Sequence, residues 1–253
     1  MRGWRRIVGG GLSTVYGLSR RISGNAAHGF RILMYHAVGA PVPDDIRSMY
    51  SVKPALFSAQ MEILADLSAG RVFPLSPRLP DAGIAVTFDD GYQDNLDTAA
   101  PILERFGIPF TVFVTPGFIQ SGNPIYLSVS ALRDLANVPG ATVGAHGYTH
   151  RRLTDCDAGE LRNELVNSRK WLEDIVGRPV TCMSYPHGAE DSRVREAVSE
   201  AGYSIAASSH AGINLPAHDP LSLARTDIWT QDNVSAFRAK IRGDWDWLTF
   251  RGK

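Results

Sequence analysis

The stretch that decides the fold is GIAVTFDDGY, residues 83–92. Its first six residues are almost continuously apolar, as in a strand covered on both faces, and two carboxylates, Asp89 and Asp90, follow at its end. Adjacent carboxylates repel each other and cost stability unless a cation or a proton relieves them. The alternative interpretation is an Asp-Gly turn in which Asp89 caps the next helix. The stretch therefore predicts a buried strand that ends in either a turn or an acidic site.

On both sides of this stretch, strands and helices alternate about seven times. The other predicted strands cover residues 31–36, 110–114, 141–145, 181–185, 204–208 and 221–228. The predicted helices cover residues 54–67, 94–106, 128–136, 157–176, 192–201 and 233–241. The clearest of them begins with Asp157 and Glu160 in the spacing of a capping box. This alternation predicts a parallel sheet with helices outside it, either closed as a barrel or open and doubly wound.

Several predicted strands end in side chains that can ionise or bind a metal. His36 ends the first strand, the Asp89–Asp90 pair follows the second, and His146 follows a later one. In a parallel barrel and in an open α/β sheet alike, ligands bind at the carboxyl ends of the strands. We therefore expect these side chains to converge on one rim.

His146 and His150, four residues apart, indicate a metal site. Zinc proteases use this spacing on a helix, but here no glutamate follows the first histidine, and Gly147 after a strand favours a loop. Two imidazoles and the carboxylate of Asp90 would supply three ligands and leave a position open for water. Each histidine alone would be interpreted as a surface or satisfied core residue. Their spacing, beside a strand end and a paired aspartate motif, favours the metal site.

The composition is that of an ordinary globular chain. The 253 residues include 26 basic and 26 acidic side chains, so the net charge is zero and nucleic acid is not an expected partner. Cys156 and Cys182 are far apart in the sequence, so neither a disulfide framework nor a zinc ribbon is expected, and a reducing compartment fits. We expect a single domain over residues 31–253, because one α/β barrel commonly occupies about 250 residues.

Residues 1–30 form a basic arm whose charged residues are all arginines. Its apolar stretch, residues 7–18, is too short for a bilayer, which takes about 20 apolar residues. Arg20 and Arg21 follow that stretch and disfavour a cleaved export signal, although the twin Arg5–Arg6 would suit one. The arm is expected to be a solvated tail or a peripheral anchor on an anionic inner leaflet, with about 1 kcal/mol per arginine. The expected location is cytoplasmic, with peripheral membrane contact through the arm.

Three motifs together resemble the polysaccharide deacetylase family, that is, the NodB-like domain or carbohydrate esterase family 4. They are TFDDGY at residues 87–92, HGYTH at residues 146–150 and SYPHG at residues 184–188, and the resemblance spans roughly residues 36–227. The resemblance implies a distorted (β/α) barrel of about seven parallel strands. It also implies that Asp89 is the catalytic base and that Asp90 binds the metal.

The segment MYHAV resembles a branch of the family with an N-terminal YHxV motif. That resemblance makes His36 the general acid, while the alternative is a strand-end histidine satisfied by backbone groups. His210 and His218 are the remaining late candidates, and both are more typical of loop residues.

The third motif departs from the family pattern, because Ser184 stands where an arginine often pairs with the catalytic aspartate. Arg225 is the candidate to orient Asp89 instead, and an ordinary rim salt bridge is its alternative. The resemblance also places the backbone N–H of His187 as an oxyanion donor and Tyr185 in the same substrate-binding segment. Trp229 is expected either to wall the acyl pocket or to pack in the core.

The implied activity is metal-dependent removal of N-acetyl groups from a sugar of a surface polysaccharide or exopolysaccharide. One divalent cation is expected, with zinc as the first choice and nickel, cobalt or iron also suited to imidazole ligands. The expected partner is an N-acetylated glycan or glycolipid. The alternatives are a deacylase or deformylase of a lipid-linked sugar at the membrane and a catalytically silent carbohydrate-binding relative.

Overall fold

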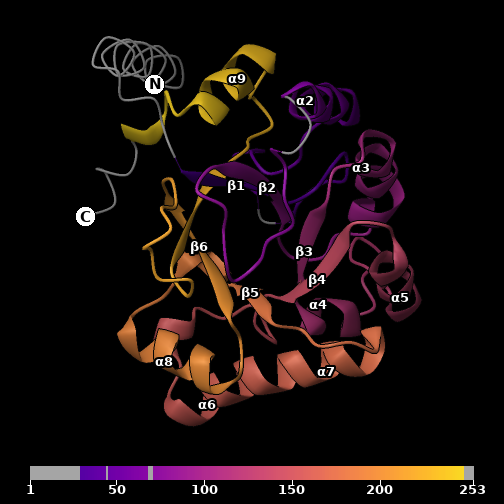
Figure 1. The fold of residues 1–253 in the computed structure, drawn as a ribbon. Helices are drawn as coiled ribbons and strands as arrows, with labels where there is room; N and C mark the ends of the chain where they lie inside the picture. The colour runs from indigo at the N-terminus through magenta and orange to yellow at the C-terminus, as the bar shows by residue number, and fades with distance from the viewer. Residues whose placement is uncertain (1–28, 44, 68–70, 248–253) are drawn as a thin grey trace.

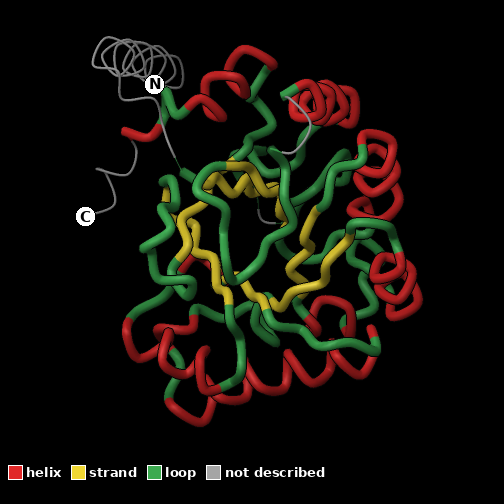
Figure 2. Tube along the Cα trace, viewed as in Figure 1, coloured by secondary structure: helices red, strands yellow, loops and turns green. Residues whose placement is uncertain are grey.

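The computed structural model describes residues 29–43, 45–67 and 71–247, and these form a closed barrel of seven parallel strands. Each strand pairs with the next along the chain, and β1 pairs with both β2 and β7, so the ring is complete (Figures 1 and 2). The strands are β1 (Phe30–Tyr35), β2 (Gly83–Phe88), β3 (Phe110–Val114), β4 (Ala141–Ala145), β5 (Cys182–Ser184), β6 (Ile205–Ala211) and β7 (Leu223–Asp227). The predicted barrel is confirmed, and the open, doubly wound alternative is wrong.

Helices surround the barrel on its outside (Figure 2). They are α2 (Pro54–Asp66), η1 (Asn95–Ala99) with α3 (Ala100–Phe106), α4 (Pro116–Gln120), α5 (Val129–Asn137), α8 (Ser192–Glu200) and α9 (Val234–Arg242). The predicted helix 157–176 consists of α6 (Ala158–Arg162), the π-helical segment η3 (Asn163–Asn167) and α7 (Ser168–Val176). Short 3₁₀ turns lie at η2 (Leu153–Asp155) and η4 (Pro186–Gly188). None of the helices in the described part of the chain has the length and apolar character needed to cross a bilayer.

The strands bury side chains on both faces, which explains their nearly continuous apolar sequences. Alternate residues of a strand point to opposite faces. In β1, Leu33 and Tyr35 belong to the large core between barrel and helices. Phe30 and Ile32 belong to a second, smaller core. Its other members, among them Ala85, Phe113, Cys182, Ile205, Ala207 and Leu223, come from strands all around the ring, so this core fills the barrel interior.

The basic arm predicted at residues 1–30 lies almost entirely outside the described residues, which begin at Gly29. The boundary between arm and domain therefore stays a prediction.

Candidate active site

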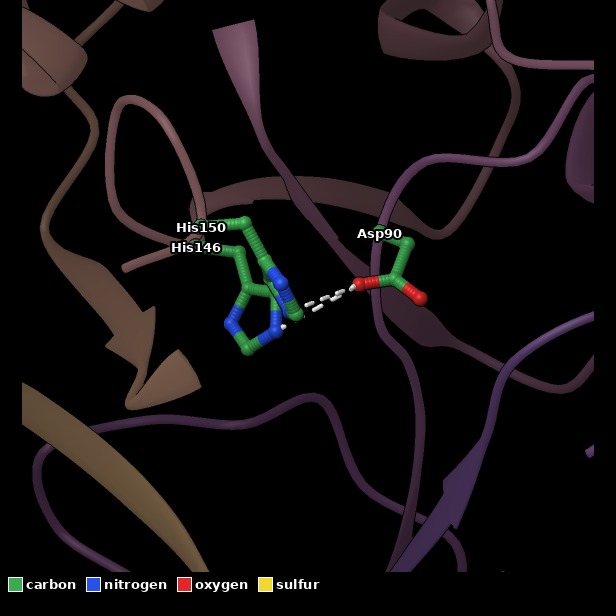
Figure 3. Close-up of side chains that lie close together, drawn as sticks. All are labelled: Asp90, His146 and His150. Atoms are coloured by element: carbon green, nitrogen blue, oxygen red, sulfur yellow. Dashed lines mark ion pairs between the residues drawn. The ribbon is translucent and has the colours of Figure 1, made fainter. Parts of the chain in front are cut away.

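Three potential metal ligands meet at the carboxyl end of the barrel. Asp90 follows β2, His146 follows β4, and His150 lies four residues further on, in the loop (Figure 3). Asp90 Oδ1 lies 3.5 Å from Nε2 of His146 and 3.3 Å from Nε2 of His150. One ligand atom from each residue lies within 4.8 Å of the other two. The predicted trio is therefore brought to one point.

The proton positions around His146 are set by Ser184. Nδ1 of His146 lies 2.9 Å from the carbonyl oxygen of Ser184 and 2.6 Å from its hydroxyl oxygen. Because a carbonyl oxygen only accepts, Nδ1 carries the hydrogen, and Nε2 presents a lone pair toward Asp90. Burial lowers the pKa of His146 to about 3, so the ring is neutral at physiological pH.

The carboxylate oxygen of Asp90 that faces the two imidazoles has no hydrogen-bond donor among the described residues. Oδ1 is buried and accepts no hydrogen bond, while the Tyr92 hydroxyl hydrogen-bonds to this carboxylate. Burial raises the pKa of Asp90 to about 6, with a further increase from the charge of Asp89. Lone pairs of Asp90 and His146 thus face each other without a proton between them. A cation would relieve this arrangement, and a carboxylate with two neutral imidazoles is a donor set that suits zinc.

Asp89 is held by Arg225 from inside the barrel. The guanidinium donates from Nη1 and Nη2 to the two carboxylate oxygens at 2.7 Å each, and both side chains are almost fully buried. The Ser184 hydroxyl donates to the same carboxylate at 3.1 Å. Burial alone would raise the pKa of Asp89, but the charge and hydrogen bonds of Arg225 outweigh it and hold the pKa well below its usual range. Asp89 is therefore ionised and fixed in orientation.

The chain matches known proteins over the same region. The sequence profile of the family described as "Polysaccharide deacetylase" matches residues 77–206, which is half of the chain. The chain belongs to the polysaccharide deacetylase family. This family region contains all three motifs and ends in β6, before Arg225.

Two curated members of the polysaccharide deacetylase family show how far the likeness extends. YxkH of Bacillus subtilis (strain 168), which is provisionally named a polysaccharide deacetylase, is 25% identical over 83% of this chain and 75% of its own length. The peptidoglycan-N-acetylglucosamine deacetylase PgdA of Listeria monocytogenes is 29% identical over 53% of this chain, which spans only 30% of that protein.

A solved polysaccharide deacetylase has the same fold. BC0361 from Bacillus cereus superimposes with a TM-score of 0.73 and 26% sequence identity, over 84% of this chain and 69% of that structure. The sequence match and the likeness of the fold therefore indicate the same family.

His36 lies at the same rim as the family motifs. It follows β1 as Asp89 and Asp90 follow β2, and the last residues of these two paired strands, Tyr35 and Phe88, are register partners. Its ring lies 4.5 Å from the ring of Tyr50, and its backbone carbonyl accepts a hydrogen bond from Asn95. Its side chain is only partly buried, so it can contact a bound molecule.

The other predicted substrate residues have different surroundings. His187 has a left-handed backbone (φ 58°), and its ring packs 4.6 Å from that of His150. Trp229 is half-buried and packs beside Lys240 and Trp245. These three residues line a small cavity next to β7. The place of Tyr185 in the substrate-binding segment stays a prediction. Its side chain is fully buried, with its hydroxyl donating to the Leu221 carbonyl at 2.7 Å.

Two contributors to the site were not singled out from the sequence. Ser184 is the residue of the third motif that stands in place of the family's arginine. Its hydroxyl connects Asp89 with His146. Tyr92 belongs to the TFDDGY motif, and its buried hydroxyl holds Asp90. Their place inside sequence motifs was the available signal. The partners of Ser184, however, follow two other strands, β2 and β4, and could not be predicted from spacing.

Proposed function

We propose that this protein is a metal-dependent hydrolase that removes N-acetyl groups from a sugar of a surface polysaccharide or exopolysaccharide. The observation that carries the proposal is the buried Oδ1 of Asp90, which lacks a partner and faces Nε2 of His146 and His150. Beside it, a second carboxylate is ionised and fixed by a buried arginine. Family membership supplies the reaction class, since the matching profile is that of polysaccharide deacetylases.

The residues that would hold the cation are Asp90, His146 and His150. When bound, a divalent cation there would polarise the amide carbonyl and lower the pKa of a coordinated water toward neutrality. Zinc is the first choice for this set of ligands, and nickel, cobalt and iron also suit imidazole.

Asp89 is the proposed general base. Its carboxylate is ionised at neutral pH, and Arg225 and Ser184 restrict it to one orientation at the rim. A base that is already oriented needs no reorganisation when it takes a proton from the attacking water. The direct neighbour of Asp89 in the chain is Asp90, so the base lies next to the proposed ligand set.

His36 is the proposed general acid. It lies at the rim directly after the first strand of the barrel, which pairs with the strand that precedes Asp89 and Asp90. From there it would protonate the leaving amine, which would otherwise depart as an unstable anion. The backbone N–H of His187 is proposed to donate to the developing oxyanion.

The proposed substrate is a glycan that contains N-acetylated amino sugars. PgdA, to which this chain is similar over 53% of its length, is named for peptidoglycan N-acetylglucosamine. The neutral overall charge of this chain is compatible with an uncharged sugar polymer.

The test is release of free amine from N-acetylglucosamine oligomers by the purified chain loaded with zinc. We expect the parent to release amine and a chelator to abolish release until zinc is restored. Asp89→Asn should lower the rate by about 10²- to 10⁴-fold, because the base is removed. The matched control is Asp97→Asn, an identical change at an exposed position of η1, which should keep the parent rate.

Binding of the oligomers by the parent without any amine release would contradict the proposal and leave a carbohydrate-binding protein. Release of acid only from a lipid-linked acylated sugar would replace the proposed substrate with a glycolipid.

A further inference from the structure

The two histidines of the proposed metal site lie on a loop that has no regular structure. On a helix, residues four apart share one face without outside help. Here Gly147 and His150 both have left-handed backbone angles (φ 65° and 64°), which a non-glycine residue such as His150 rarely adopts. Something outside the loop must therefore set the spacing of the two imidazoles.

Glu164 makes the required contacts. Its Oε2 accepts the backbone N–H groups of Tyr148 and Thr149, at 2.7 Å and 2.9 Å. Its Oε1 accepts the hydroxyl of Thr149. Three donors from two consecutive loop residues thus converge on one carboxylate, as backbone N–H groups do around a bound anion.

Glu164 is a buried acid that forms no ion pair with a described lysine or arginine. Its exposed fraction is 5%, and none of the lysines or arginines in the described ranges forms an ion pair with it. A buried charge costs stability unless hydrogen bonds satisfy it. The three loop donors satisfy this charge, so removal of the carboxylate would take away the acceptor of the Tyr148 and Thr149 N–H groups.

The helix that carries Glu164 makes a second contact with the loop. Glu164 lies in the π-helical segment η3, and Ser168, four residues later, donates its hydroxyl to the Gly147 carbonyl at 2.8 Å. A Cβ at Gly147 would lie 3.0 Å from Glu164 Oε2, so a larger residue would crowd the carboxylate. π-Helical turns occur frequently at functional sites. One helical face thus binds both an N–H pair and a carbonyl of the loop.

We propose that Glu164 is a positioning residue that sets the distance between His146 and His150 for the cation. This inference rests on the proposed metal site. Partners of this kind, one shell away from the metal, typically change metal affinity by 10- to 100-fold when they are removed.

The experiment measures Co²⁺ affinity and the visible absorption spectrum of the Co²⁺-loaded full chain. Glu164→Ala should weaken Co²⁺ binding by at least 10-fold and change the absorption bands, since the ligand geometry shifts. Glu164→Gln should fall between Ala and the parent, because its carbonyl oxygen can accept both N–H groups and its amide can donate to Thr149.

Two controls separate positioning from general stability. Leu172→Ala removes a fully buried side chain of α7, eight residues beyond Glu164 in the chain, and should lower the melting temperature with unchanged Co²⁺ affinity and spectrum. Asp174→Asn makes the same carboxylate-to-amide change at an exposed position of α7 and should match the parent.

A Glu164→Ala protein with the parent's affinity and spectrum would overturn the inference while the metal site stands. Loss of Co²⁺ affinity in Leu172→Ala equal to that in Glu164→Ala would also overturn it, because the effect would then be global. A parent chain that binds neither Co²⁺ nor Zn²⁺ would overturn the proposed function and this inference together.

Discussion

At the scale of single residues, the orientation of Asp89, the proposed base, depends on an arginine far away in the sequence. Arg225 comes from β7 and Asp89 follows β2, 136 positions apart. Arg225 also donates to the Ser208 carbonyl at 2.7 Å and lies 5.7 Å above the ring centre of Phe113. Its planar guanidinium therefore has a fixed pose, which a lysine could not reproduce.

Replacement of Arg225 by methionine should destabilise the fold by about 3–5 kcal/mol at pH 7, because the buried Asp89 loses its partner. The sign of the pH effect follows from the pKa of Asp89, which Arg225 lowers. Stability from this group is present above its unfolded pKa and is lost as the pH falls through its folded value. In Arg225→Met the burial of Asp89, which raises its pKa, is no longer outweighed, so the folded variant takes up a proton as the pH falls from 7. The parent keeps its contribution until the pH falls below about 4. The difference in unfolding free energy between parent and Arg225→Met should thus shrink from pH 7 toward pH 4 because the variant's penalty is relieved, as urea unfolding would show.

The matched control is Arg31→Met, which breaks another buried bidentate ion pair, with Asp246. Arg31 lies near the start of β1, at the other end of the strand from His36. This variant should lose comparable stability yet keep the parent's deacetylation rate, whereas folded Arg225→Met should lose activity. Equal activity of the two variants would contradict the proposed role of Arg225.

The sequence was informative about residues at strand ends and uninformative about partners inside the barrel. Asp90, His146 and His150 could be expected together because parallel strands place their carboxyl ends on one rim. The hydrogen bond from Ser184 to Asp89 joins the ends of β5 and β2, 95 positions apart, so no local sequence pattern predicts it. The contact of the Tyr185 hydroxyl with the Leu221 carbonyl could not be predicted from its motif either, because the two residues are 36 positions apart.

At the scale of elements, the packing of the barrel interior requires a glycine at position 144 in β4. A Cβ at Gly144 would lie 2.5 Å from the ring of Phe113 and 2.9 Å from the sulfur of Cys182. Phe113 in turn lies beneath Arg225. Because residue 144 has no side chain, the Phe113 ring has room to pack against the guanidinium of Arg225.

Gly144→Ala should destabilise the protein by about 1–3 kcal/mol, the usual cost of overfilling a packed core. It should also lower deacetylation activity, because a displaced Phe113 would move Arg225. Thermal unfolding and amine release measure the two effects. Gly159→Ala is the control, since a Cβ there meets only Asp157 Oδ1 at 3.4 Å and alanine favours the helix α6. A Gly144→Ala protein as stable and active as this control would contradict the packing argument.

Element boundaries were predictable where sequence pattern and burial agree. The observed bounds of β2, β3 and β4 are those predicted from their continuous apolar runs. The π-helical segment η3 was not predictable, because the capping box and apolar spacing of residues 157–176 indicate one continuous helix. Helix α4 was missed because Pro116 and Gly117 resemble a turn, although proline is well tolerated in the first turn of a helix.

At the scale of the whole molecule, the barrel closes on itself while the basic arm lies outside the described residues. We propose that the arm attaches the protein peripherally to anionic membranes. Residues 1–30 contain five arginines and no acidic residue, and each arginine near an anionic surface contributes about 1 kcal/mol. The described chain begins at the start of β1, at the opposite end of the barrel from the candidate active site.

The full chain should co-sediment with vesicles that contain anionic lipid, and a chain without residues 1–28 should stay in the supernatant. Added salt should release the full chain, because the attraction is electrostatic. Zwitterionic vesicles are the control for non-specific adsorption. Equal sedimentation of the two chains would contradict the anchor, and both should deacetylate soluble oligomers at the same rate.

The pairing of Arg225 with Asp89 also ties chemistry to the completion of folding. Asp89, the proposed base, follows the second strand of the ring and Arg225 lies on the seventh, so the pair forms only after β7 has docked beside β1. A nascent chain, or one that has lost its last strand, would have a carboxylate at the rim with no opposite charge to keep it ionised. Hydrolysis would therefore report on barrel closure, and incompletely assembled molecules would be inactive without any separate inhibitor.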